Sequence, residues 1–295
     1  MYDQITSNRR RTVLIVAIAV IFLAGAGYFL GYLLTDIGIA GPVIALVIAA
    51  AMSFYSYRYG DRLVLRAARA RKVTAQEEPR LHNIVEGLSL AAGLPKPEVY
   101  VVPERALNAF ATGRDPEHSS VAVTQGLLDS MNRLELEGVI AHEMAHIQGR
   151  DILLGTIVGT LVGAVVLMAE FMLRIFWWGG GRSRRAGALP LVLVGFAFAI
   201  LASLFAQLIR VAVSRRREYL ADAQGALFTR YPPGLASALK KIAADNTPMR
   251  ATNNATAHLW LKQPSRTPGE RYNWFESLFS THPPIGERIR ILEEM

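Results

Sequence analysis

The sequence predicts a multi-span helical membrane protein that also carries an α+β domain outside the bilayer. Of the 295 residues, 52% are hydrophobic and only 19% are charged, a balance too apolar for one or two soluble domains of this length. Four apolar runs each reach about 20 residues, the length that a helix needs to cross a bilayer core. They are residues 12–34, 37–57, 152–176 and 186–209.

Basic residues beside these runs predict which side of the membrane the polar segments face. Clusters at residues 9–11, 58–72 and 215–217 flank the same side of the spans, and this excess of Lys and Arg marks that side as cytoplasmic. The loop between the third and fourth runs departs from the rule, because residues 182–185 include three arginines. Attraction to anionic lipids explains the net charge of +8, so the lipid bilayer is an expected partner and nucleic acid is not.

The spans divide the chain into four parts. Residues 1–59 form an N-terminal transmembrane hairpin, residues 60–150 a first polar part, residues 151–213 a second hydrophobic hairpin, and residues 214–295 a second polar part. The second hairpin returns the chain to the side that it left. We therefore expect both polar parts to fold together as one domain.

Helices and strands follow one another in the first polar part, which makes it α+β. Residues 77–92 have apolar positions at helical spacing and end at Gly93, a common helix terminator. A second helix is predicted from Arg133, because Asn132 and Glu135 stand at the positions of a capping box. The strands expected between these helices are residues 97–103, 108–113 and 120–124.

The second helix carries the segment His142-Glu143-Met144-Ala145-His146. Histidines four residues apart lie on one helix face, so both imidazoles can bind one ion, and zinc prefers such ligands. Glu143 stands beside the first histidine, where a carboxylate can take a proton from a catalytic water. The chain has no cysteine, so any further ligand is a histidine or a carboxylate. The sequence therefore predicts one zinc ion per chain.

The third ligand decides the kind of zinc site. A metzincin-type site would need histidine where this chain has Ile152, and Asp151 is rotated by about 100° from that direction. Glu170 would lie on the order of 25 Å away along a spanning helix. Glu218 follows the fourth span on the same side as His142. We therefore expect Glu218 to complete the site.

Asp222 lies one helical turn after Glu218, on the same face. A carboxylate there can hold the second ring nitrogen of a zinc histidine, which fixes the tautomer of the ring. The alternative is an acid exposed to solvent or paired with Arg216 or Arg217, and spacing alone does not decide between these roles.

With these features the chain resembles the HtpX-like membrane metallopeptidases, which are related to the CAAX prenyl endopeptidases. The resemblance rests on the two N-terminal spans, the His142–His146 segment, the second hydrophobic pair, residues 214–222, and the Thr281-His282-Pro283-Pro284 segment. It implies a zincin-like (gluzincin) catalytic domain on the cytoplasmic side of the cell membrane. It also implies that the protein degrades misfolded membrane proteins as part of a stress response.

Matched residue by residue, the resemblance implies zinc on His142, His146 and Glu218, with Glu143 as general base. His282 precedes two prolines in a turn and is a candidate for stabilising the oxyanion of the reaction intermediate.

The segment Asn108-Ala109-Phe110-Ala111 resembles the edge strand near the active site of that family. An edge strand can bind an extended polypeptide by backbone pairing, with little preference for its sequence. An ordinary sheet strand is the alternative.

Three functions are compatible with these residues. The first is a membrane zinc endopeptidase, and the second is a prenyl-peptide (CAAX-type) protease with the same site. The third is a non-catalytic metal-binding scaffold, although structural zinc sites normally have four protein ligands and this chain offers three. Polypeptides, above all membrane proteins, are the expected partners. A second copy of the chain and other quality-control proteases are open alternatives.

Overall fold

The computed structural model describes residues 40–157, 215–249, 259–262 and 283–295, together with isolated positions between residues 6 and 21. The predicted spans at 12–34, 152–176 and 186–209 lie wholly or mainly outside these residues. His282 lies outside them too.

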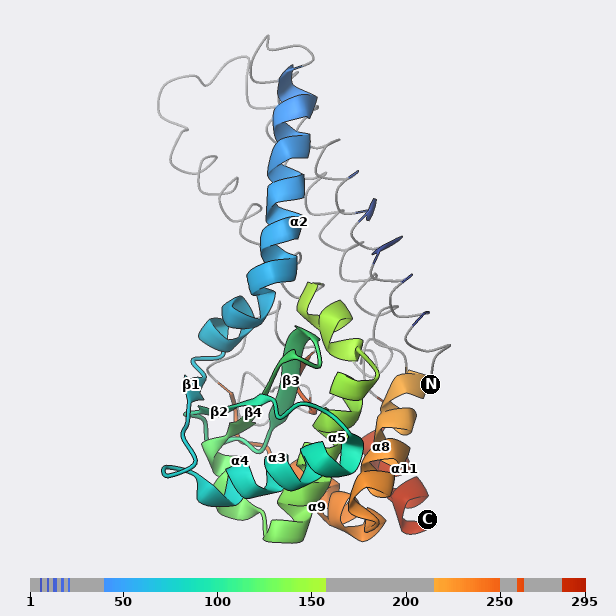
Figure 1. The fold of residues 1–295 in the computed structure, drawn as a ribbon. Coiled ribbons are helices and arrows are strands. Elements are labelled where there is room, and N and C mark those ends of the chain that lie inside the picture. The colour runs from blue at the N-terminus through green and yellow to red at the C-terminus, as the bar shows by residue number, and fades with distance from the viewer. Residues whose placement is uncertain are drawn as a thin grey trace, which may run out of the picture.

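Helix α2 (Ala40–Ala67) extends away from the sheet and from the other labelled helices (Figure 1). It overlaps the predicted span 37–57 but continues for almost three more turns. These turns are helical because Val64 and Leu65 are buried near Val102 and Phe110 of the sheet. In the part of the chain that the structure describes, no helix combines the length and hydrophobicity needed to cross a membrane.

A four-stranded sheet in the order β1-β2-β4-β3 lies below this helix. Strand β4 is parallel to β2 and antiparallel to β3, while β1 is antiparallel to β2. The strands are β1 (Arg71–Lys72), β2 (Glu98–Val102), β3 (Ala109–Asp115) and β4 (His118–Thr124). Only β1 was not expected, since two residues carry no alternating pattern.

The hairpin of β3 and β4 is tighter than the sequence predicts. Instead of a loop over residues 114–119, only Pro116 and Glu117 separate the strands. The turn is closed by Asp115, whose Oδ1 accepts a hydrogen bond from the backbone N–H of His118 at 2.8 Å. An Asp that caps its own turn in this way lets both strands continue to the corner.

The predicted helices are confirmed, with one of them shorter at its start. Helix α3 (Pro79–Ala92) ends at Gly93, which has a left-handed φ of 64°. Helix α5 (Arg133–Gln148) begins with the capping box: Asn132 Oδ1 accepts from the Glu135 N–H, and Glu135 Oε2 accepts from the Asn132 N–H, both at 2.9 Å. The short helix α4 (Gln125–Ser130) follows β4 and precedes α5 along the chain.

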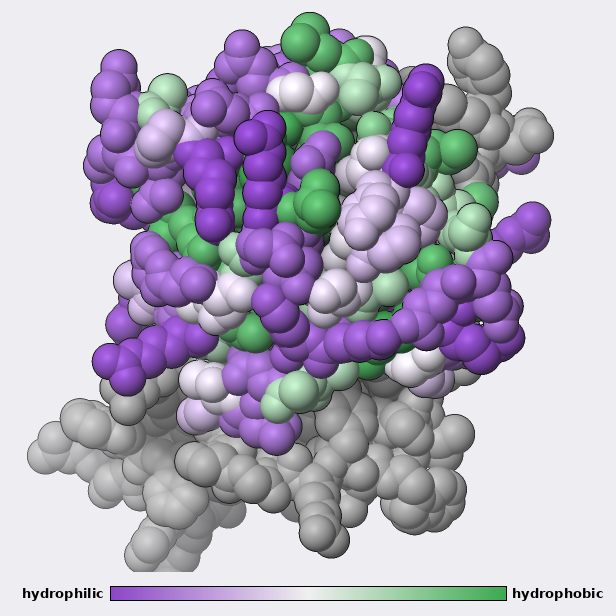
Figure 2. Space-filling view, turned by 90° about the horizontal axis from the view of Figure 1, so that it is seen from below, coloured by the Kyte–Doolittle hydropathy of each residue, from purple (hydrophilic) through white to green (hydrophobic). Residues whose placement is uncertain are grey.

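Helix α5 is the centre of the described structure (Figure 1). It packs against β3, α3, α8 (Arg215–Thr229) and α9 (Pro232–Ala244), while α11 (Ile285–Glu293) packs against α8 and α9. One hydrophobic core contains Ile140, Leu239 and Leu292, so both polar parts of the sequence contribute to it. The end of the molecule opposite α2 is mostly hydrophilic, with separate apolar patches (Figure 2).

Gly138 allows α5 and α9 to approach closely. A Cβ at this position would lie 2.6 Å from the backbone nitrogen of Leu235. We expect Gly138→Ala to destabilise the protein by about 1–3 kcal/mol, because the helices must separate. The thermal unfolding midpoint of the detergent-purified protein should fall by roughly 3–10 °C.

Gly87→Ala in α3 is the matched control, because a Cβ there meets no atom within 4 Å. Helix propensity favours alanine by about 1 kcal/mol, so this variant should unfold at the same temperature or higher. Equal losses in both variants would contradict the packing argument.

Candidate metal centre

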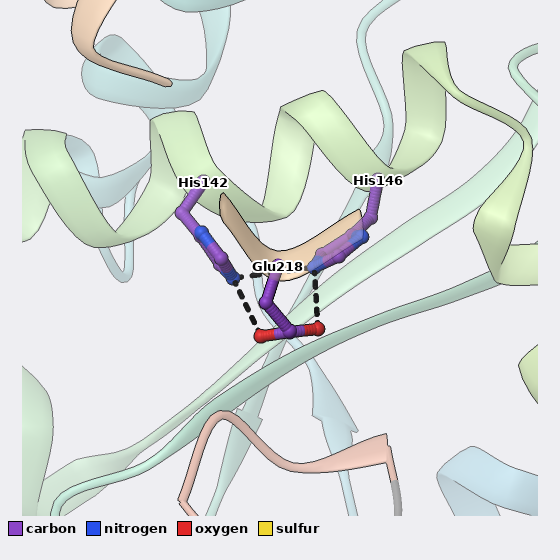
Figure 3. Close-up of side chains that lie close together, drawn as sticks. All are labelled: His142, His146 and Glu218. Atoms are coloured by element: carbon purple, nitrogen blue, oxygen red, sulfur yellow. Dashed lines mark hydrogen bonds and ion pairs between the residues drawn. The ribbon is translucent and has the colours of Figure 1, made fainter. Parts of the chain in front are cut away.

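Helices α5 and α8 bring His142, His146 and Glu218 together (Figure 3). The Nε2 atoms of the two histidines are 3.2 Å apart. Glu218 Oε2 lies 3.8 Å from the first of these nitrogens, and Oε1 lies 3.5 Å from the second. Ligand atoms about 2.0 Å from a tetrahedral zinc ion would be about 3.3 Å apart, so these three donors fit one such ion.

The three donors differ in exposure. His142 is 1% exposed and Glu218 is 3% exposed, whereas the side chain of His146 is 16% exposed. The His146 side is therefore the more open side of the site. Burying such polar groups lowers the stability of the fold unless each forms hydrogen bonds or ion pairs. The other contacts of the three side chains therefore have to be identified.

Asp222 pairs with His142. Its Oδ1 lies 2.9 Å from His142 Nδ1, the ring nitrogen that points away from Glu218. The arginine that pairs with Asp222 is Arg288, not Arg216 or Arg217. Its Nε donates to Asp222 Oδ2 at 2.8 Å and its Nη2 donates to Asp222 Oδ1 at 2.7 Å. Burial alone would raise the pKa of Asp222, but the charge of Arg288 and these hydrogen bonds lower it to about 2.

Arg288 is a site residue that sequence reasoning missed. Its side chain is 1% exposed, and Nη1 lies 3.5 Å from Glu218 Oε2. The sequence signal that was missed is its spacing in α11. Ile285 lies three residues before Arg288 and Leu292 four residues after it, so this arginine lies on the apolar face of the helix. A charged residue on such a face needs a buried partner.

Asp151 takes the equivalent place beside His146. Its Oδ2 lies 3.1 Å from His146 Nδ1. Burial lowers the pKa of His146, but hydrogen bonding to Asp151 and the nearby carboxylates outweigh this effect and raise the pKa to about 9. From the sequence, Asp151 was weighed only as a metal ligand. In the structure it is not one of the three donors that converge on the metal position.

Glu143 is buried between α5 and β3, with 3% of its surface exposed. Burial raises its pKa, although the two histidines and a hydrogen bond from the backbone of Ala111 act in the opposite direction. A carboxylate with a raised pKa can accept a proton from water and hold it.

Strand β3 lies at the edge of the sheet, next to Glu143. Thr124 N–H donates to the Asn108 carbonyl, so the alternation of antiparallel pairing turns the backbone groups of Ala109, Ala111 and Gly113 outward. All three positions have partners within the chain, and at Ala111 the backbone N–H donates to Glu143. The Ala109 carbonyl accepts from Leu261 N–H at 3.0 Å, and the carbonyl of Gly113 accepts from the hydroxyl of Thr156 at 3.2 Å.

The side chains of the predicted pairing segment also have partners. Asn108 donates through Nδ2 to the Lys262 carbonyl at 2.7 Å and accepts from the Lys262 N–H at 3.1 Å. Phe110 packs edge-to-face on Trp260 with ring centroids 4.6 Å apart. Both side chains are buried, so Asn108 and Phe110 hold β3 in place and are not available to a substrate.

Known proteins resemble this chain in sequence and in fold. Residues 75–295 match the model of "Peptidase family M48". A "Protease HtpX homolog" of Thermoanaerobacter pseudethanolicus is 45% identical over 300 residues, which cover 100% of this chain and 98% of the relative. One of Pyrococcus furiosus is 45% identical over 287 residues, or 97% and 95% of the two chains.

A solved structure shares the fold. The crystal structure of S. mikatae Ste24p matches with a TM-score of 0.51 at 17% identity, over 99% of this chain and 67% of that chain. Because the family model covers most of the chain and the relatives cover nearly all of it, this protein belongs to peptidase family M48.

Proposed function

We propose that this protein is a membrane-embedded zinc endopeptidase that hydrolyses misfolded or damaged membrane proteins. The observation that carries the proposal is the convergence of His142, His146 and Glu218 within reach of one ion, with Glu143 buried beside them. Three protein donors with a neighbouring carboxylate are typical of a catalytic zinc site, whereas a structural site would have four. Among the described residues three donors meet, which supports the peptidase over the metal-binding scaffold.

The membrane location is supported by the sequence and by the relatives. Four apolar runs have the length of a span, and the basic clusters beside them favour an active site on the cytoplasmic side. The relatives are named as proteases, which fits polypeptide substrates. Membrane proteins as substrates, and a role in quality control, follow from the resemblance to the HtpX-like enzymes.

The residues of the site have separate tasks. His142, His146 and Glu218 would hold the zinc ion, which when bound polarises the scissile carbonyl and acidifies a water molecule. Glu143 takes the proton from the attacking water and passes it to the leaving amine. Asp222 accepts the Nδ1 proton of His142, which leaves Nε2 free for the ion. His282 is proposed to donate a hydrogen bond to the oxyanion.

Substrate would pair with the Ala111 carbonyl of β3, because the Ala111 N–H donates to Glu143. Its neighbours at the outer edge, Ala109 and Gly113, already have partners in the chain, so only a short stretch of substrate can pair there. The hydrogen bond from Ala111 to Glu143 supports a position of this stretch next to the scissile bond. Recognition through one backbone position gives little preference for sequence.

The role of Glu143 is tested by Glu143→Gln, which keeps the shape of the side chain but cannot take a proton. We expect zinc to remain bound and the turnover of a fluorescently labelled unfolded protein to fall by at least about 10²–10⁴-fold. Glu137→Gln is the matched control, because it lies on the same helix outside the site. A Glu143→Gln protein that cleaves at the rate of the wild type would exclude Glu143 as the base.

The ligand role of Glu218 is tested by Glu218→Ala. Zinc affinity, measured by competition with a chelator, should fall more than about 100-fold, because even outer partners of zinc ligands contribute about 10–100-fold. Glu287→Ala, an exposed acid on α11, should bind zinc like the wild type. Equal affinities in the two variants would remove Glu218 from the site.

Pairing at Ala111 is tested on the substrate side, with a peptide that is N-methylated at one amide after another. Methylation at one position next to the scissile bond should lower kcat/KM by roughly twofold to tenfold, since a hydrogen bond contributes about 0.5–1.5 kcal/mol. More distant positions should have no effect, because Ala109 and Gly113 are engaged. A loss that extends over four or more positions would indicate that the whole edge is open to substrate.

A further inference from the structure

Asp151 reaches His146 only because the chain breaks after α5. Helix α5 ends at Gln148, Arg150 has a left-handed φ of 56°, and residues 151–157 form a new helical segment. In an uninterrupted helix, Asp151 would lie about 140° around the axis from His146. A residue other than glycine in this conformation costs about 1–2 kcal/mol, so the surrounding structure must hold the turn.

The second oxygen of Asp151 is bound by α8. Arg217 donates from Nη1 to Asp151 Oδ1 at 3.1 Å. Arg217 directly precedes Glu218, so this ion pair joins the end of α5 to the start of α8 next to two of the three donors. The side chains of Asp151 and Arg217 are mostly buried, at 16% and 13% exposed.

The arrangement repeats the one at the other histidine. His142 contacts Asp222, which is bound by Arg288, and His146 contacts Asp151, which is bound by Arg217. The two arginines come from different helices, so the repetition is not a consequence of one local sequence pattern. In both cases a carboxylate faces Nδ1 while Nε2 faces the other donors.

The geometry points to Asp151 and Arg217 as a positioning pair for His146. Asp151 accepts the Nδ1 proton and so presents Nε2 to the metal, and Arg217 holds Asp151 in place. This inference rests on the zinc site of the proposed function. It also gives Arg217 a role inside the site, in addition to its place in the basic cluster at residues 215–217.

Asp151 and Arg217 can be substituted without disrupting the hydrophobic core, because their side chains are less buried than those of Asp222 and Arg288. Zinc affinity of the full chain in detergent is measured by chelator competition. Asp151→Asn has one acceptor oxygen and cannot serve both His146 and Arg217, so we expect zinc to bind about 10–100-fold more weakly. The absorption spectrum of the cobalt-substituted protein should shift as well.

Arg217 is tested in the same assay. We expect Arg217→Gln to bind zinc roughly threefold to tenfold more weakly and Arg217→Lys to stay within about threefold of the wild type, because one donor and the charge are kept. In an Asp151→Asn background, Arg217→Gln should add less than about twofold, since Arg217 acts through Asp151. A merely structural arginine would add its full effect in both backgrounds, and this outcome would overturn its role.

Exposed residues of the same two types provide matched controls. Asp129→Asn and Arg216→Gln should leave zinc affinity and the cobalt spectrum unchanged. Wild-type affinity and spectrum in Asp151→Asn would overturn the inference. If that variant does not fold, Arg217→Gln decides, and unchanged affinity overturns the inference. A wild-type chain that binds no zinc would instead refute the proposed function, so the two failures are distinguishable.

Discussion

The packing of α5 against α8 is the contact on which the rest of the site depends. It places two histidines of one helix opposite Glu218 of the other, inside a hydrophobic core. Glu143, Glu218 and Asp222 bring three carboxylates into this region, and Arg288 supplies one buried positive charge. When all three acids are ionised and both histidines are neutral, as metal ligands must be, two negative charges are left over, which a divalent cation would balance. The same electrostatics that make the cluster costly without an ion favour binding of one.

Local signals in the sequence predicted much of this arrangement. The capping box at Asn132 and Glu135 and the spacing of His142 and His146 depend on residues within a few positions of each other, and α5 has these features. Glu218 was chosen by topology, because it follows an apolar run on the same side as His142. That choice needed only the order of spans and polar segments.

Contacts between distant segments were not predictable in the same way. The bond from Arg288 to Asp222 depends on where α11 packs, and the approach of Asp151 to His146 depends on the left-handed turn at Arg150. The partners of Ala109 and Gly113 on β3 come from segments far away in sequence. These contacts follow from tertiary packing, and the spacing of residues along a single helix or strand does not predict them.

The most direct test of the central claim is proteolysis by the detergent-purified wild-type protein with and without its metal. Cleavage of a labelled unfolded protein should stop after a chelator has removed the metal, and one equivalent of zinc should restore it. Cleavage that continues at the same rate in metal-free protein would contradict the account, because Glu143 alone would then have to activate the water.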